Sequence, residues 1–324
     1  MEPLPKGANF KRAKMLWEIG LHIAGDPNEP YTGNRDICIT VGSGSAESYR
    51  PWLRMSSGSP ILAHAVARRE LEMAIVNPSG LLTQAYRGTG LFPRPLPVRV
   101  IASYPSWDRF VFAIHPRTGI TSLAQVKEKR YPLRISTRED PTHSTHVLIA
   151  QTLALYGFSM SDVESWGGSL QLNGPPGDQR RLDALRNGSI DAVFDEGIIG
   201  WLDAALEAGM KPMALEEPVF SKLQAIGWRK AVLPASVYPR LGSDHAVIDY
   251  SGWPLYSHAS MPDEIAYKVC GALHARIDEI EWENKPWAPF PGMGGLGRET
   301  ESTPRDVPLH PGAEKWYREH GFAV

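Results

Sequence analysis

The chain has 324 residues, of which 42% are hydrophobic and 22% charged, the composition of an ordinary globular protein of about two domains. Its 34 basic and 36 acidic side chains nearly balance, and no lysine- and arginine-rich stretch stands out, so nucleic-acid binding is not expected. No run approaches the ~18 apolar residues of a membrane-spanning helix, so membrane insertion is not expected either.

Residues 1–35 are interpreted as an N-terminal arm. They contain no apolar core and no small-residue cleavage site of a signal peptide. From the sequence as written we expect a cytoplasmic protein, and a periplasmic one if the true start lies upstream or a signal was removed. A short amphipathic helix is predicted within the arm, because Leu16, Ile19 and Ile23 recur at helical spacing.

The two cysteines, Cys38 and Cys270, lie far apart and belong to no CxxC motif or Cys/His cluster. This spacing argues against a disulfide framework and against a structural zinc site. Cys38 stands in an apolar run and Cys270 in a helical pattern, so both are interpreted as small buried hydrophobic residues.

A first α/β unit follows the arm. The segment "DICITVG" (36–42) predicts a buried strand, and "SGSPILAHAVARRE" (57–70) predicts a helix with Ser59 as N-cap. "LEMAIVN" (71–77) and "VRVIASY" (98–104) predict two further strands with a short helix between them. Strands that alternate with helices are typical of a parallel sheet with crossover helices.

A second α/β unit follows an extended stretch at residues 107–116. Strands predicted at 133–137 and 190–194 alternate with helices, three of which end at glycine. A further extended segment at 246–259 crosses back, and a capping box with Ser260 as N-cap begins a long helix. A Pro- and Gly-rich loop and a terminal helix complete the chain.

Two α/β units joined by extended crossings predict one lobe inserted into the other, with a cleft between the lobes and a hinge in the crossings. We expect lobe I to comprise residues 36–110 and 246–324, and lobe II residues 111–245, all boundaries being approximate. Each lobe of this α/β fold is expected to be a mainly parallel sheet flanked by helices.

Three segments of the chain are similar to one known family. They are "ITVGSGSAESYRP" (39–51), a strand with a Gly/Ser-rich loop and a tyrosine, "ALRNGSIDAVF" (184–194), a helix–glycine–strand unit, and "VPLHPGAEKWYREHG" (307–321), which contains the family's "lHPGA" and a helix. In this order and spacing the chain resembles the TAXI-type solute-binding subunits of tripartite (TRAP) transporters, within the type II periplasmic-binding-protein fold.

The resemblance implies a solute-binding protein that closes a hinge around a small organic molecule. This ligand is expected to bear a carboxylate and to be an organic acid or an amino acid. The resemblance also implies uptake together with a TRAP membrane permease, and no cofactor. Here the first loop is one residue shorter than the family's and has one tyrosine, Tyr49, in place of two.

Three loops of the predicted fold lie where strands lead into helix N-termini. Free N–H groups and the helix dipole at such positions favour a carboxylate or a phosphate. The loops are Ser43-Gly44-Ser45, Asn77-Pro78-Ser79 and Thr142-His143-Ser144-Thr145. The alternative for each loop is that it serves only as a helix cap or turn.

Aromatic and basic side chains stand near the predicted first crossing. Arg109 could form a forked pair with a carboxylate, while Trp107 stacks on the body of the ligand. The alternative for Arg109 is a salt bridge between the lobes. Tyr49 and Trp52 could line the wall of lobe I, or they could belong to its core.

His143, His146, Asp195 and Glu196 are candidates for one cluster of polar groups. Histidine and carboxylate ligands suit several divalent metals, but no metal site is expected from an isolated HxxH pattern. Asp195 and Glu196 are predicted to contact an amine or hydroxyl of the ligand, or to hold a protonated histidine. Their alternative role is to stabilise the N-terminus of the helix that follows.

Catalytic motifs are not found in the sequence. It contains no GxSxG elbow, P-loop, GxGxxG or HExxH motif, so we expect no catalytic residue and no enzyme. Two alternatives are kept. One is an enzyme on the same fold, decarboxylase-like or thiamine-pyrimidine-synthase-like, and the other is a stand-alone cytoplasmic ligand sensor.

Overall fold

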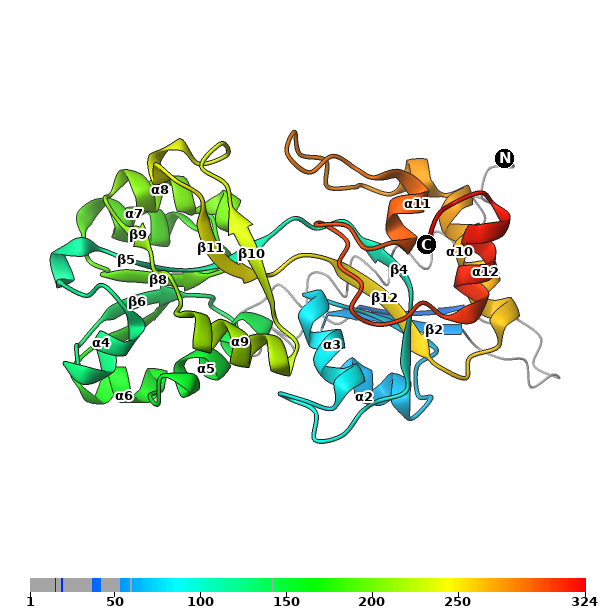
Figure 1. Ribbon diagram of the computed structural model, residues 1–324, viewed down its shortest axis with the longest axis horizontal. Coiled ribbons are helices and arrows are strands. Elements are labelled where there is room, and N and C mark those ends of the chain that lie inside the picture. Colours follow the sequence, from blue (N-terminus) through cyan, green and yellow to red (C-terminus); the bar gives the residue numbers. More distant parts are fainter. Residues whose placement is uncertain (1–14, 16–18, 20–36, 42–52, 59, 142) are drawn as a thin grey trace.

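The computed structural model describes residues 15, 19, 37–41, 53–58, 60–141 and 143–324. Two α/β lobes lie side by side, joined by extended crossings (Figure 1). In the colours of Figure 1 the chain passes from lobe I (blue and cyan) into lobe II (green and yellow) and returns to lobe I (orange and red). The expected two-lobe α/β fold is confirmed, while the residue boundaries of the lobes stay a prediction.

The described strands of lobe I form one sheet in the order β1-β2-β3-β12-β4. Their bounds are β1 Ile37–Val41, β2 Leu53–Gly58, β3 Met73–Val76, β4 Val98–Tyr104 and β12 Trp253–His258. β2 and β3 run parallel, whereas β12 runs antiparallel to both of its neighbours, β3 and β4. β12 follows the second crossing, so the returning chain enters the sheet between two earlier strands. The sheet is therefore mixed rather than mainly parallel.

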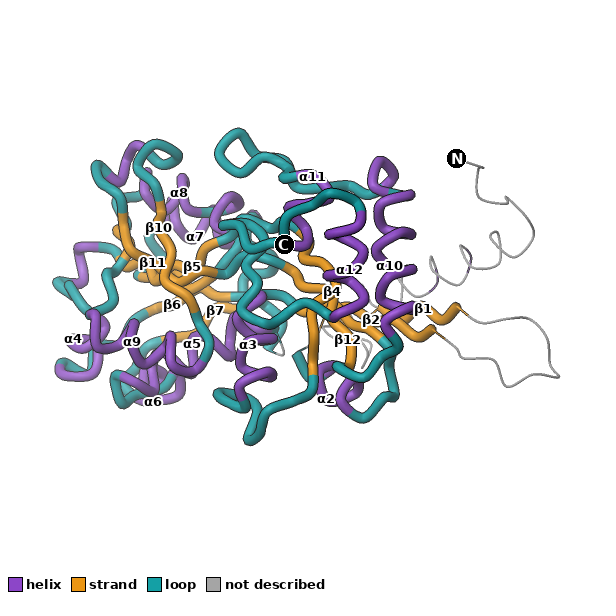
Figure 2. Tube along the Cα trace, turned by 45° about the vertical axis from the view of Figure 1, so that its right-hand side comes forward, coloured by secondary structure: helices purple, strands orange, loops and turns teal. Residues whose placement is uncertain are grey.

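Helices cover both faces of this sheet (Figures 1 and 2). Those on one face are α2 Leu62–Ala67 and α3 Ser79–Arg87, and those on the other are α10 Asp263–Ala275, α11 Gly292–Gly297 and α12 Pro311–Glu319. α10 and α12 pack side by side (Figure 2), and Cys270 of α10 is buried as expected. α11 lies within the segment predicted to be loop.

The "HPGA" segment starts α12 and packs it against α10. His310 is the N-cap, and its Nδ1 accepts the N–H of Gly312 at 3.2 Å, while Pro311 occupies the first helical turn. A Cβ atom on Gly312 would lie 2.0 Å from the carbonyl oxygen of Asp263, the first residue of α10. The family motif is therefore explained here by the close approach of two helices.

The strands of lobe II form a second mixed sheet in the order β10-β11-β5-β8-β6-β7, with β9 paired to β5. Their bounds are β5 Arg109–Ile114, β6 Arg134–Thr137, β7 Ser169–Leu172, β8 Ala192–Asp195, β9 Lys211–Pro212, β10 Arg229–Leu233 and β11 His245–Asp249. β6, β7 and β8 run parallel, and the strands next to the crossings run antiparallel to their neighbours. The carboxyl ends of β6, β7 and β8 therefore meet at one edge.

Helices cover both faces of the second sheet as well (Figure 1). They are α4 Leu123–Glu128, α5 Ser144–Leu155, α6 Met160–Ser165, α7 Gln179–Asn187, α8 Leu202–Glu207 and α9 Glu217–Ile226, with short 3-10 turns η1 Pro116–Thr118, η2 Ile198–Gly200 and η3 Pro239–Leu241. A fourth 3-10 turn, η4 Ile277–Glu279, follows α10 in lobe I. β5 is buried along its whole length, with Phe110 and Phe112 in one core and Val111 and Ala113 in the other. This alternation follows the two-residue period of a strand.

The expectations of a buried β1, a buried Cys38, Ser59 as the N-cap of α2 and Ser260 as the N-cap of α10 were wrong. β1 is an edge strand whose Cys38 is exposed, because β2, which was not predicted, takes the position next to β3. α2 begins at Leu62 with Ile61 as its N-cap, and Ser59 lies outside the described residues. Ser260 does not cap α10, since its Oγ contacts Nδ1 of His258 and the N-cap is Pro262.

The two crossings connect β4 to β5 and β11 to β12, and a third segment of chain lies along both. Ser106 donates its N–H to the carbonyl of Ser302 at 3.0 Å, and Ser251 donates its Oγ–H to the carbonyl of Glu301 at 2.9 Å. The lobes also touch directly after α3, where Thr89 donates its hydroxyl to the carbonyl of Ile226 of α9 at 2.6 Å. In the part of the chain described, no helix is both long and apolar enough to span a bilayer.

Candidate ligand site between the lobes

Arg109, the predicted anion-binding residue of the first crossing, is fully buried and engaged by the protein itself. Its guanidinium donors go to the carbonyls of Val232 and Asp108 and to the carboxylates of Asp249 and Glu301. The guanidinium also lies 4.3 Å from the ring centroid of Trp107, which is itself buried. These contacts favour the alternative reading of Arg109 as a salt-bridge residue and leave Trp107 no open face for a ligand.

The neighbouring Asp108 ties the first crossing to lobe II. Its carboxylate accepts the backbone N–H groups of Gly197, at 2.8 Å, and of Arg109, at 2.7 Å. Burial raises the pKa of Asp108 to about 6, although these hydrogen bonds favour the charged form. The group is therefore a structural acid whose charge state changes in mildly acidic solution.

The N-termini of α3 and α5, both predicted to bind an anion, are instead hydrogen-bonded to the second crossing. Ser79, at the start of α3, donates its N–H at 3.3 Å and its Oγ–H at 2.9 Å to the carbonyl of Ser251. Ser144, at the start of α5, lies with its Oγ 2.5 Å from the hydroxyl of Tyr250, and Thr145 Oγ1 lies 3.4 Å from it. Adjacent residues of one crossing thus hold a helix from each lobe.

Several predicted site residues cannot be placed. They are Ser43, Gly44, Ser45, Tyr49, Trp52 and Thr142, which lie outside the described residues. Their roles stay predictions. His143 is the N-cap of α5, since its Nδ1 accepts the N–H of Thr145 at 3.2 Å.

A polar cluster does form at the carboxyl edge of β6, β7 and β8, and its central residue is Arg138. The pairing of Ile135 with Ala192 and Ser136 with Val193, continued along the strands, brings Arg138 opposite Asp195. The Nε of Arg138 lies 3.6 Å from Oδ1 of Asp195. Its Nη2 pairs directly with the carboxylate of Glu196, the next residue.

Behind this edge a second arginine supports the cluster. Arg181 of α7 pairs with Asp195 at 2.7 Å, and neither side chain is exposed. Burial, the largest influence on both groups, raises the pKa of Asp195 and lowers that of Arg181. Both directions agree that burying these charges costs more than their attraction returns. Perturbed pKa values of this kind are found at functional sites and in structural ion-pair networks alike.

The predicted histidines lie beside the cluster. Nε2 of His143 is 4.0 Å from the carboxylate of Glu196, and Nε2 of His146 donates to the carbonyl of Arg138 at 3.1 Å. Within the described residues no group of three or more histidine, cysteine, aspartate or glutamate side chains is arranged to hold a metal ion.

Several of the buried polar atoms without a hydrogen-bond partner lie at or directly after the carboxyl ends of strands. In lobe II they are Thr137 Oγ1 at the end of β6, Arg138 Nε directly after it, and Asn173 Oδ1 directly after β7. In lobe I, Asn77 Oδ1 follows β3. Buried polar groups almost always have partners, so unpartnered atoms on both sides mark a place where a ligand can bind.

Sequence reasoning identified Asn77 but missed Thr137, Arg138, Asn173 and Arg181. For three of them the signal that could have found them is their position at or directly after the end of a strand. Thr137 ends a predicted strand, Arg138 follows it, and Asn173 follows β7, which was not predicted. The rule that picked out Asp195, a polar residue at the end of a strand, would have found Thr137 and Arg138. Arg181 is different, because it lies within α7 and not at the end of a strand.

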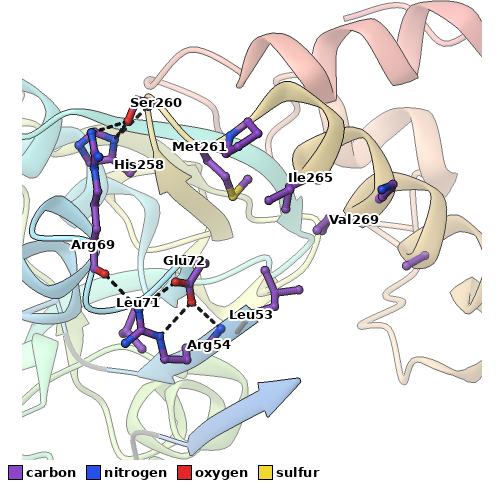
Figure 3. A pocket seen from close by; sticks show the side chains of 13 residues that line it. Leu53, Arg54, Arg69, Leu71, Glu72, His258, Ser260, Met261, Ile265 and Val269 are labelled. Atoms are coloured by element: carbon purple, nitrogen blue, oxygen red, sulfur yellow. Dashed lines mark hydrogen bonds and ion pairs between the residues drawn. The ribbon is translucent and has the colours of Figure 1, made fainter. Parts of the chain in front are cut away.

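A separate cavity of about 1010 Å³ lies in lobe I (Figure 3). One wall is formed by Ile265 and Val269 of α10 together with Met261, which precedes the helix, and another includes Leu53 of β2. Two of its charged side chains, Arg54 and Glu72, are paired with each other at 2.9 Å. We place no ligand in this cavity.

Comparison with known families agrees with the extent of the fold. The model of the NMT1-like family matches residues 47–321, which include both lobes and the "HPGA" segment. The chain belongs to the NMT1-like family.

Solved structures of several binding proteins are similar to this chain at low identity. The alkanesulfonate-binding protein SsuA from Xanthomonas axonopodis pv. citri is 14% identical over 69% of this chain and 82% of its own, with a TM-score of 0.28. The ferric binding protein from Campylobacter jejuni is 12% identical over 79% of each chain, with a TM-score of 0.36. The L-cystine solute receptor of Neisseria gonorrhoeae is 14% identical over 67% of this chain and 66% of its own, with a TM-score of 0.28.

Proposed function

We propose that this NMT1-like protein is a solute-binding protein that holds a small organic molecule with an acidic group between its two lobes. The observation that carries the proposal is the set of unpartnered polar atoms at strand ends in both lobes, Asn77 on one side and Thr137, Arg138 and Asn173 on the other. Ligands of open α/β sheets bind beyond the carboxyl ends of strands. A molecule that contacts both sets joins the lobes.

Arg138 is the residue proposed to bind the acidic group. Its side chain is 11% exposed, so a ligand can reach it, and its Nε has no hydrogen-bond partner among the described residues. A guanidinium presents donors in a fork that matches a carboxylate or another oxyanion. Arg109 has no such donor to offer, because its contacts lie within the protein.

Hinge closure is proposed to accompany binding. Tyr250 and Ser251 of the second crossing are held by α5 of lobe II and α3 of lobe I, so a change at this crossing moves helices of both lobes. A ligand that needs groups from both lobes stabilises the closed arrangement by its differential affinity.

The finer parts of the proposal come from the sequence. The resemblance to TAXI-type subunits supports a carboxylate ligand and a TRAP-type permease as partner. A periplasmic location, the second expectation from the sequence, goes with this function, since an uptake protein meets its permease outside the inner membrane. Proteins similar in structure include ones named for sulfonate and phosphonate, which are solutes with an acidic group.

The experiment that tests the function is a binding screen with a turnover control. Dicarboxylates, amino acids, sulfonates and aromatic acids should be tested for a rise in melting temperature, because a ligand stabilises the state that binds it. For a hit, Arg138→Gln should weaken binding by ~1.5–3 kcal/mol, the value of a hydrogen bond to a charged group. Consumption of the hit with turnover would instead show an enzyme.

A matched control variant exists on the same strand. Arg134 stands at the amino end of β6 and pairs with Asp191 at 2.8 Å, as Arg138 pairs with Asp195 at the carboxyl end. Arg134→Gln removes an equal charge from the opposite edge of the sheet. It should leave affinity unchanged, and an equal loss in both variants would show that Arg138 acts through stability alone.

A further inference from the structure

Glu196, the acid paired with Arg138, indicates a second charged group on the ligand. We infer that the ligand carries a cationic amine as well as its acidic group, so that it is a zwitterion of the amino-acid kind. This inference rests on the proposed function, since it concerns the same site. The juxtaposition behind it is the direct ion pair of Arg138 with Glu196 at the edge that faces lobe I.

Charges in the described part of the site leave no surplus of positive charge. Arg138 and Arg181 face Asp195 and Glu196, which makes two bases and two acids. The loop after β6 adds Glu139 and Asp140, while Arg180 nearby is already paired with Asp178 at 3.0 Å. The acids therefore at least match the bases.

Two undescribed parts of the sequence, residues 42–52 and residue 142, carry no net charge. The segment 42–52 has one acid, Glu47, and one base, Arg50, and residue 142 is an uncharged threonine. A purely anionic ligand would thus enter a site whose positive charges already have partners.

Displacement of Glu196 decides which ligands fit. A plain carboxylate that binds the fork formed by Nε and Nη2 of Arg138 displaces Glu196 from Nη2 and leaves the carboxylate of Glu196, only 8% exposed, without that cation. An isolated buried charge is strongly unfavourable. A zwitterion gives its acidic group to Arg138 and its ammonium group to Glu196, so that each protein charge exchanges one partner for another and the net charge of the site stays the same.

One protein group competes with the ligand amine for this role. His143 has its Nε2 4.0 Å from the carboxylate of Glu196, and a protonated imidazole could neutralise that acid after displacement. In that case plain carboxylates would bind, and they would bind more tightly in acidic solution. The charged groups that face Glu196 from the other packed elements are Arg138 and, behind it, Arg181 with Asp195. The pH dependence of carboxylate binding therefore shows whether His143 or a ligand amine neutralises Glu196.

The test is calorimetric titration with matched sets of small probes. The zwitterions are glycine, β-alanine, 4-aminobutyrate, glutamate and a phenylalanine. Each is compared with the acid that lacks the amine, such as acetate, propionate, butyrate or glutarate, and with the amine that lacks the acid. We expect at least one zwitterion to bind the wild-type protein at least tenfold more tightly than either of its matched partners.

Glu196→Gln identifies the protein group responsible. This variant should weaken the zwitterion at least tenfold and strengthen or leave unchanged the matched acid, so that the preference for the zwitterion disappears. Asp191→Asn is the control, because Asp191 pairs with Arg134 at the other end of the same strands. It should change affinity and preference less than twofold, and melting curves of each variant report whether the fold is kept.

The outcomes distinguish this inference from the proposed function. The inference is overturned if the wild type binds an acid and its amino analogue with equal affinity, or if an acid binds only at low pH. In either case, binding that depends on Arg138 still supports the proposed solute-binding function. Equal weakening of acid and zwitterion in Glu196→Gln makes Glu196 a positioning residue and also overturns it. Millimolar probes of all three kinds that fail to bind, or binding unaffected by Arg138→Gln, count against the proposed function itself.

Discussion

Arg181 and Asp195 form an ion pair whose side chains are both fully buried, with 2.7 Å between Nη2 and Oδ2. The pair joins α7 to the end of β8 and stands directly behind Arg138 of the candidate site. Arg181 also donates to Ser136 Oγ at 3.0 Å, so the pair connects a helix with two strands. It fixes the edge of the sheet on which the ligand groups stand.

Removal of Arg181 should be strongly destabilising. Arg181→Met leaves the buried carboxylate of Asp195 with the more distant Arg138, and breaking a buried pair in this way costs about 3–5 kcal/mol. Urea denaturation at pH 7 measures the loss. The control is Arg186→Met, on the same helix, since that side chain is 63% exposed and a surface pair contributes ~0–1 kcal/mol. Equal effects of the two variants would contradict the role of the buried pair.

Asp108 should make stability depend on pH in the acidic range. Its pKa is about 6 in the folded protein and lower in the unfolded chain, so the folded state holds the proton more firmly. The stability contributed by this group is largest below pH ~4 and is lost as the pH rises through the folded value of about 6. Asp108→Asn should flatten the pH profile, by on the order of 2–3 kcal/mol between pH 4 and 7.

Thermal melting of Asp108→Asn and wild type at half-unit pH steps measures this difference. The exposed Asp203 of α8 provides a control, and Asp203→Asn should leave the profile unchanged. A difference between Asp108→Asn and wild type that stays constant from pH 4 to pH 7 would show that burial does not perturb Asp108.

Gly312→Ala should separate the two packed helices of lobe I. The new Cβ would lie 2.0 Å from the carbonyl oxygen of Asp263, and this backbone atom cannot move without shifting α10. Overpacking of this kind costs ~1–3 kcal/mol. Gly271→Ala is the matched control in α10, where the nearest atom, Nε1 of Trp316, is 3.5 Å away. That variant should be neutral or slightly stabilising, because alanine favours a helix over glycine.

Ligand binding should change the contact between the lobes near Trp228. This residue lies at the start of β10 in lobe II and packs on α3 of lobe I, where a Cβ on Gly80 would meet its ring at 2.9 Å. A saturating ligand should reduce the radius of gyration in small-angle scattering and shift tryptophan emission. The emission shift should disappear in Trp228→Phe and persist in Trp166→Phe. A bound ligand that changes neither signal would contradict hinge closure.

Much of the fold could be predicted because its periodicity is local. β4 occupies Val98–Tyr104 as predicted, and α7 ends at Gly188, whose φ of 71° is easily adopted by glycine. The position of β12 could not be predicted. A strand that returns after a long insertion pairs by long-range register, and nothing in its own sequence specifies the neighbours β3 and β4.

The candidate site was predictable in part for the same reason. Strand ends can be located from sequence, so Asn77, His143, Asp195 and Glu196 were named, and the structure places the last three together. Ser79 and Ser144 were also named, but their hydroxyls are bonded to the second crossing. A hydroxyl at the start of a helix can hydrogen-bond either to a ligand or to another part of the protein, and only the tertiary structure decides which.

By itself the sequence determined the α/β class, the two lobes and the order of most elements, because apolar periods and glycine stops act over a few residues. Only the tertiary structure decided the roles of the arginines. Arg109 became an internal salt-bridge residue, while Arg138 came to the ligand edge and Arg181 was buried behind it. Each of these arginines has an acidic partner 14 or more residues away, such as Asp249 at 140 residues from Arg109. The energy of a charge depends on burial and on partners of this kind, which the spacing of neighbouring residues does not encode.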